Sequence, residues 1–155
     1  MIRPDRLTLK AQEAFRDAAQ LASARGNPVV NDAHLFLALL NQEEGVIQPL
    51  LQKAGLNVSA LRAATEREVA KFPTQEGSDA SAAYSRELNK VFDRAEREAK
   101  DLGDAYVSTE HLLIALVEEK GTTARGLLSG HGLSAGDLRA ALEAVRGSHR
   151  VTDQA

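Results

Sequence analysis

The longest apolar run of the chain ends in Leu35-Phe36-Leu37-Ala38-Leu39-Leu40, and a similar run, Leu112-Leu113-Ile114-Ala115-Leu116-Val117, follows 77 residues later. A residue suited to the N-cap of a helix precedes each run, Asn31 in the first case and Ser108 in the second. Neither run has a polar face, and a helix that is apolar on all sides is a buried helix. We therefore expect two buried helices at equivalent places in the chain.

The same spacing relates most of the chain to itself. Residues 7–67 align with 84–144 without a gap, and 18 of the 61 aligned positions are identical. Chance would give only a handful of identities, so the alignment indicates a tandem duplication. The identical pairs include Phe15/Phe92, Gly26/Gly103, Val30/Val107, His34/His111, Leu50/Leu127, Gly55/Gly132, Leu61/Leu138 and Arg62/Arg139.

Each copy is expected to form four helices. The first begins after Thr8 or Ser85, which are plausible N-caps, and stops at Gly26 or Gly103. The second is the buried run, the third is short and stops at Gly55 or Gly132, and the fourth covers about 58–71 or 135–146. No convincing strand pattern appears. We expect an all-α fold of eight helices, as two pseudo-twofold-related four-helix repeats that share one core, because half the chain is too small to build one alone.

The expected organisation is one domain, residues 1–146, followed by a tail. Repeat one covers about 7–71, a linker 72–83 and repeat two about 84–146. Residues 147–155 are polar and unpatterned, so we expect a flexible tail leading to a further module.

Composition excludes several classes of protein. Of the 155 residues, 43% are hydrophobic and 26% charged, which are ordinary globular values. The net charge of -3, the 4% of aromatic residues and the lack of a basic block argue against a nucleic-acid partner. With no cysteine there is no disulfide and no thiol chemistry. No signal peptide or membrane-length run is visible, so we expect a cytoplasmic protein without a membrane partner.

Two stretches resemble catalytic motifs only in part. Residues 132–136 match the nucleophile elbow of hydrolases around Ser134, but a helix precedes the serine where that motif needs a strand. An N-cap role for Ser134 is therefore favoured over a hydrolase. Residues 121–126 begin like a phosphate loop, but Leu127 and Leu128 stand where lysine and serine or threonine are needed.

His34 and His111 are equivalent in the repeat, which raises the possibility of a shared metal. A metal site needs further ligands at helical spacing, and none is present, so local hydrogen bonding in the first helical turn is favoured. We expect no cofactor, no metal and no catalytic residue in this chain, and hence no enzyme activity of its own.

Binding remains the favoured role. Two similar halves meet along a seam, and such seams form grooves that accept peptide segments. Tyr84, Leu88 and Val91 could line one wall of a groove, although plain core packing is favoured for Leu88 and is as good an interpretation for Tyr84 and Val91.

The duplicated pattern resembles the Clp N-terminal (double Clp-N) domain of AAA+ unfoldases over residues 3–146. Among the branches it is most similar to ClpB-type disaggregases, through the stretch 40–45 and the long linker that begins at Phe72-Pro73. The stretches that carry the resemblance to the family as a whole include Asp5-Arg6-Leu7-Thr8, His34-Leu35, Pro49-Leu50-Leu51 and Ser108-Thr109-Glu110-His111-Leu112-Leu113.

The resemblance implies a mobile, non-catalytic module of a hexameric chaperone whose absent modules would bind ATP. It would bind unfolded or aggregated proteins and deliver them to the ATPase pore, with an adaptor or an Hsp70-type co-chaperone as further possible partners. Residues matching Thr8, Asp104 and Glu110 are associated with substrate handling in that branch. Each also has a local interpretation, as N-cap, turn residue or helix-dipole partner. The alternative is an adaptor-docking domain of a ClpC/ClpA-type protease-coupled unfoldase. The resemblance to the ClpC branch implies a phosphoarginine site with an acidic residue before each equivalent histidine. Ala33 stands at this position in the first copy, which argues against a symmetric site.

Overall fold

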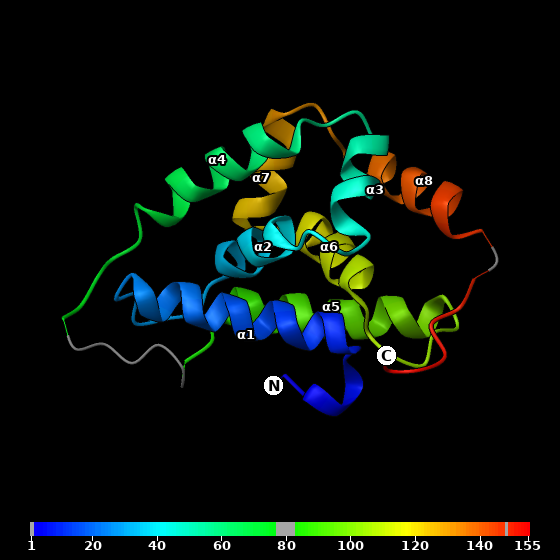
Figure 1. The fold of residues 1–155 in the computed structure, drawn as a ribbon, viewed down its shortest axis with the longest axis horizontal. Helices are drawn as coiled ribbons and strands as arrows, with labels where there is room; N and C mark the ends of the chain where they lie inside the picture. The colour runs from blue at the N-terminus through cyan, green and yellow to red at the C-terminus, as the bar shows by residue number, and fades with distance from the viewer. Residues whose placement is uncertain (1, 77–82, 148) are drawn as a thin grey trace.

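The computed structural model describes residues 2–76, 83–147 and 149–155. Within these residues the chain forms eight α-helices and a short 3₁₀ helix at Pro4–Arg6, which confirms the expected all-α fold (Figure 1). The helices are α1 (Leu9–Ala24), α2 (Asp32–Asn41), α3 (Ile47–Lys53), α4 (Val58–Val69), α5 (Arg86–Asp101), α6 (Thr109–Glu118), α7 (Thr123–Gly130) and α8 (Ala135–Arg146).

The helix ends follow local capping chemistry. The hydroxyl of Thr8 accepts a hydrogen bond from the backbone N–H of Ala11 at 3.2 Å, and that of Ser85 accepts one from Leu88 at 3.0 Å. Ser134 and Asp137 form a reciprocal capping box at the start of α8, which confirms the N-cap prediction for Ser134. Helix α4 ends at Val69, two residues before the expected boundary, because the chain tightens into i→i−3 bonds ahead of Pro73.

The two repeats are interlocked rather than set side by side. In each repeat the first helix packs on the second, α1 on α2 and α5 on α6. The short third helix instead packs against the fourth helix of the other repeat, α3 on α8 and α4 on α7. Figure 1 shows the result, with α1 and α5 along one face, α2 and α6 in the middle, and the pairs α4–α7 and α3–α8 at opposite ends of the other face.

One core serves both repeats, as expected. Helices α2 and α6 are buried along nearly their whole length and contact each other at its centre. The equivalent residues Phe15 and Phe92 meet edge to face with their ring centroids 6.3 Å apart. No helix among the described residues is long and apolar enough to span a membrane.

Two isolated parallel bridges tie the repeats together near the starts of their first helices. Leu7 pairs with Val107, and Tyr84 pairs with Val30. In the first bridge the residue just before the first helix of repeat one pairs with repeat two, and in the second bridge the equivalent residue of repeat two pairs with repeat one. Since 7 corresponds to 84 and 30 to 107 in the duplication, the two bridges are pseudo-twofold equivalents. They are the only extended pairing in the described part of the chain.

In each repeat, the chain that follows the fourth helix is hydrogen-bonded to the turn that follows the first helix. After α4 the backbone N–H of Gln75 donates to the carbonyl of Gly26 at 2.8 Å, and after α8 the N–H of Ala105 donates to the carbonyl of Val151 at 2.7 Å. The described tail residues, 149–155, therefore lie along the domain, beside the start of α1 (Figure 1). The expected linker, 72–83, is described only at its two ends.

Candidate functional site

A surface pocket of about 420 Å³ lies where the end of α8 meets the start of α3, close to the N-termini of α1 and α6. We call it the α3–α8 pocket. Its lining includes the side chains of Thr8, Val46, Leu50, Glu110, Leu142 and Val145. The last residues of the tail border it as well. The four elements around the pocket come from both repeats, so the pocket exists only because the repeats are interlocked.

Exposed apolar side chains gather at this pocket. Five large apolar residues are exposed in the described part of the chain, and two of them, Val46 and Val145, line the pocket at 42% and 51% exposure. A third, Leu9 at 58%, is the chain neighbour of the lining residue Thr8. Exposed apolar groups concentrated in a concave place mark an interaction site more strongly than groups scattered singly.

Polar and charged groups surround the apolar part. Lys10, Arg146 and Arg150 contribute positive charge to the lining, while Glu110 and Asp153 contribute negative charge. Glu110, in the first turn of α6, accepts a hydrogen bond from the hydroxyl of Ser108. The mixed charge gives the pocket a polar edge without a dominant sign.

The duplication provides a counterpart pocket of about 410 Å³ between α4 and α7. We call it the α4–α7 pocket. Glu68 and Thr123 stand there at the positions equivalent to Val145 and Val46. The buried carboxylate of Asp32 accepts a hydrogen bond from the backbone N–H of Thr123 at 2.8 Å. Its burial raises the pKa of Asp32 in spite of that hydrogen bond. The two pockets share a place in the fold, but the exposed valines belong to the α3–α8 pocket alone.

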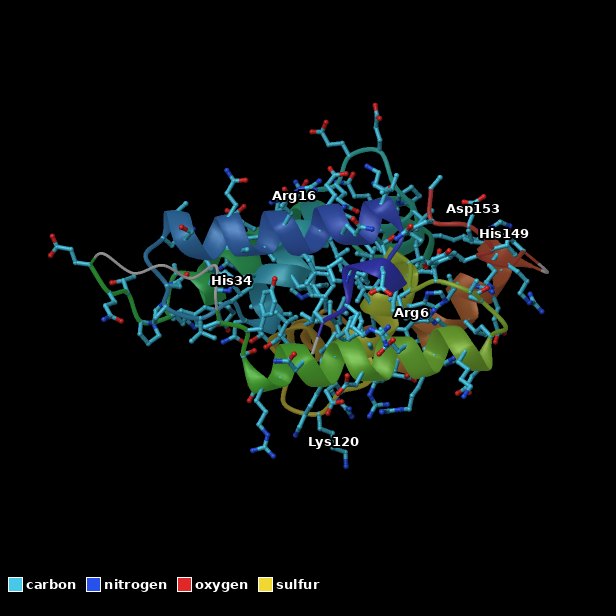
Figure 2. The ribbon with its side chains drawn as sticks, turned by 90° about the horizontal axis from the view of Figure 1, so that it is seen from below. Arg6, Arg16, His34, Lys120, His149 and Asp153 are labelled. Carbon is cyan, nitrogen blue, oxygen red and sulfur yellow. The ribbon has the colours of Figure 1, made fainter. Side chains whose placement is uncertain are left out.

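The two equivalent histidines are held by local hydrogen bonds, as predicted. His34 Nδ1 accepts from the backbone N–H of Asn31 at 2.8 Å, and His111 Nδ1 accepts from that of Ser108 at 2.8 Å. Each Nε2 then faces the residue seven positions earlier, Asn27 Oδ1 at 2.9 Å or Asp104 Oδ2 at 2.7 Å. Because Nδ1 accepts, Nε2 carries the hydrogen and donates it. His34 is fully buried, and in the view of Figure 2 it is seen between the ribbons of α1 and α5.

Asp104 connects His111 to the α3–α8 pocket. Its other oxygen, Oδ1, accepts from Arg146 Nη2 at 2.6 Å and from the backbone N–H of Val151 at 2.8 Å. Burial alone would raise the pKa of Asp104, but the hydrogen bonds from Arg146, Val151 and His111 outweigh it and lower that pKa. Asp104 thus fixes both the end of α8 and the tail beside the pocket.

The structure brings together some of the residues singled out from the sequence and separates others. Thr8 and Glu110 line the α3–α8 pocket, and Asp104 lies behind its wall. Leu88 and Val91 are both fully buried, so neither has surface available to a partner in this structure. Tyr84 is 37% exposed and packs against Phe15 with ring centroids 6.4 Å apart, away from the residues that line the pocket.

Sequence reasoning missed the apolar residues of the site. Val46 and Val145 each stand where the other repeat has a polar residue, Thr123 and Glu68. A departure from the repeat toward an exposed apolar side chain was the available signal. For metals, the described residues contain no group of three or more ligating side chains.

The architecture defines the class of protein: an all-α domain of two interlocked four-helix repeats. The chain belongs to the family of the Clp repeat (R) N-terminal domain, whose profile matches residues 6–131. It is 41% identical over 145 residues to the chaperone protein ClpB of Mycobacterium bovis, and 35% identical over 147 residues to ClpB of Bdellovibrio bacteriovorus. These matches cover 94% and 95% of this chain, but the chain spans only 17% of the length of either relative.

Solved structures show the same fold. The N-terminal domain of Hsp104 from Candida albicans superimposes with a TM-score of 0.84 at 21% identity, covering 96% of both chains. The N-domain of ClpV in a complex with VipB peptide has a TM-score of 0.73 at 17% identity, covering 98% of this chain and 92% of that one. At these identities the likeness concerns the fold.

Proposed function

We propose that this chain is the substrate-recruiting, non-catalytic N-terminal domain of a ClpB-type disaggregase. In this role the α3–α8 pocket holds a segment of unfolded or aggregated polypeptide, which passes to ATPase modules in the remainder of a longer chain. The similarity to ClpB sequences supports the parent protein, and the length of those relatives leaves room for such modules.

The observation that carries the binding site is the pair of exposed valines, Val46 and Val145, on the lining of the α3–α8 pocket. An unfolded polypeptide offers apolar side chains that a folded protein buries, and these side chains complement the two valines. The volume of about 420 Å³ has room for only a few residues. A weak affinity is expected, because ordering a disordered segment opposes binding.

Thr8, Glu110 and Asp104 have distinct parts in this proposal. Thr8 and Glu110 stand on the lining, where they can meet the polypeptide backbone. Asp104 acts indirectly, since its carboxylate is bound to Arg146, His111 and Val151. We assign Asp104 a positioning role for the pocket wall.

The direct test is an NMR titration of the chain with a short labelled peptide of alternating valine and serine, which we call the probe peptide. Amide shifts are expected at Thr8, Val46 and Glu110. Val46→Ser and Val145→Ser should each weaken binding about fivefold, the effect of roughly 1 kcal/mol from one partly buried valine. Val29→Ser changes a valine that is 36% exposed outside the pocket lining, so it should bind as the parent chain does. Equal affinity in all four chains would contradict the proposal.

A second candidate is an adaptor-docking domain, as in ClpC/ClpA-type unfoldases. The charged edge of the pocket, with Lys10, Glu110 and Arg146, favours a partner of defined sequence, and a ClpV N-domain was solved in a complex with VipB peptide. A chaperone domain should bind the probe peptide and a scrambled version of it equally. An adaptor-docking domain should instead retain one folded partner and ignore both peptides.

A further inference from the structure

The tail forms one edge of the α3–α8 pocket. Val151, Thr152, Asp153 and Ala155 all contribute to its lining. They form no helix or strand, and they continue from α8 past the start of α1. Figure 2 shows His149 and Asp153 at the same end of the molecule, beside the last turns of α8.

Backbone groups hold this segment. The N–H of Ala105 donates to the carbonyl of Val151 at 2.7 Å, and the N–H of Leu9 donates to the carbonyl of Gln154 at 2.7 Å. In return, the N–H of Val151 donates to Asp104 Oδ1 at 2.8 Å. The first N–H groups of a helix have no partner within the helix, and Leu9 is the first residue of α1. The tail therefore satisfies donors that the domain would otherwise offer to solvent or to a ligand.

Within residues 151–155, a side chain also holds the segment in place. Gln154 Nε2 donates to the carbonyl of Leu7 at 2.9 Å. Thr152 and Asp153 are exposed, so they contribute little to the docking energy. Any extended polypeptide carries the same alternation of N–H and C=O groups as the tail, and strand-like addition of a peptide depends on such main-chain bonds.

We propose that residues 151–155 are an internal competitor for the backbone N–H groups of Leu9 and Ala105 at the edge of the α3–α8 pocket, and that a polypeptide in the pocket extends onto these groups after the tail has left them. This inference rests on the proposed function and adds its regulation. Competition of this kind lowers the apparent affinity in proportion to the fraction of molecules in which these N–H groups are free.

The test compares four chains for binding of the probe peptide by fluorescence anisotropy: the 155-residue chain, a version that ends at Arg150, Gln154→Ala, and Gln20→Ala. Gln20 is an exposed glutamine of α1 outside the pocket lining, so its variant is the matched control. Freeing the N–H groups of Leu9 and Ala105 should tighten binding about three- to tenfold in the truncated chain, less in Gln154→Ala, and not at all in Gln20→Ala. In the 155-residue chain the peptide should also shift the amide signals of Val151 and Gln154.

The outcomes separate this inference from the proposed function. Equal affinity in all four chains, with Val151 and Gln154 unmoved by bound peptide, overturns the competitor and leaves the pocket as a binding site. Weaker binding after truncation also overturns it, because the tail would then be part of the site. Absence of binding in every chain overturns both proposals. If circular dichroism shows the truncated chain unfolded, Gln154→Ala decides the question.

Discussion

The two histidines in the first turns of α2 and α6 accept the same kind of backbone hydrogen bond but face different partners. His34 donates to the neutral amide of Asn27, whereas His111 donates to the carboxylate of Asp104. Burial, with a smaller contribution from the charge of Arg25, lowers the pKa of His34 to about 4. The surroundings of the two histidines therefore share the same hydrogen-bond geometry but differ in their electrostatics.

A pH-dependent loss of stability should follow from His34. The unfolded chain protonates this histidine near its ordinary pKa of 6.5, and the folded chain resists protonation down to about 4. The contribution of His34 to the free energy of unfolding is therefore fully present above about pH 6.5. It falls as the pH drops toward 4, by roughly 3 kcal/mol at most. Urea unfolding at a series of pH values measures this decline.

Asn27→Asp supplies the matched change, because it gives His34 the carboxylate that His111 already has. The carboxylate favours the protonated imidazole, so the decline between pH 6.5 and 4 should shrink. Asn41→Asp adds the same charge at an exposed position at the end of α2 and should leave the decline unaltered. An equally steep decline in the Asn27→Asp chain would show that His34 is not its source.

Asp104→Asn tests the buried charge pair. The amide can still accept from His111, as Asn27 does from His34, but it no longer neutralises Arg146, whose side chain is only 7% exposed. An unpaired buried charge of this kind should reduce the free energy of unfolding by about 3 kcal/mol. The exposed Asp101→Asn change should be nearly neutral. Adding Arg146→Met to Asp104→Asn should recover part of the loss; additive losses would contradict the pairing.

At the scale of helices, Thr8 and Ser85 are equivalent N-caps with different surroundings. Both hydroxyls accept a backbone hydrogen bond in the first turn, but only Thr8 lines the α3–α8 pocket. Replacing either with alanine should lower the free energy of unfolding by about 1 kcal/mol. Only Thr8→Ala should also weaken binding of the probe peptide. Equal effects of the two variants on binding would show that Thr8 acts through the helix cap alone.

Most helices could be predicted from the sequence because their ends are chemically marked. N-caps such as Thr8, Ser108 and Ser134, and glycines such as Gly26 at a φ of 70°, fix the boundaries locally. The predicted end of α4 was two residues too late, because the chain tightens ahead of Pro73, before the apolar pattern ends. Boundaries without a strong local signal depend on what packs against them.

The candidate site was harder to predict, because it depends on how the repeats interlock. Nothing in the spacing of the sequence shows that α3 of one repeat meets α8 of the other, and this contact is what brings Val46 and Val145 to the same pocket. Tyr84, Leu88 and Val91 were candidates for one wall of a groove, with core packing favoured for Leu88, and the structure places Leu88 and Val91 in the core and leaves Tyr84 partly exposed. Thr8 and Glu110 were found through family resemblance, which reflects the three-dimensional arrangement indirectly.

At the scale of the whole molecule, the shared core predicts one cooperative unfolding transition. Phe15 from one repeat and Phe92 from the other contact each other, and α3 and α7 each pack on the opposite repeat. Urea transitions followed by circular dichroism and by tyrosine fluorescence should therefore coincide. Separate chains of residues 1–76 and 83–155 should each be unfolded alone. A stable, folded half would contradict a core that both repeats must complete.

The measurement that most directly tests the central claim uses the internal control that the duplication provides. A nitroxide-labelled probe peptide should broaden the amide signals of Thr8, Val46 and Glu110, which line the α3–α8 pocket. The signals of Thr123 and Phe72 in the equivalent α4–α7 pocket should stay sharp. Equal broadening at both pockets, or broadening confined to Thr123 and Phe72, would contradict the assignment of polypeptide binding to the α3–α8 pocket.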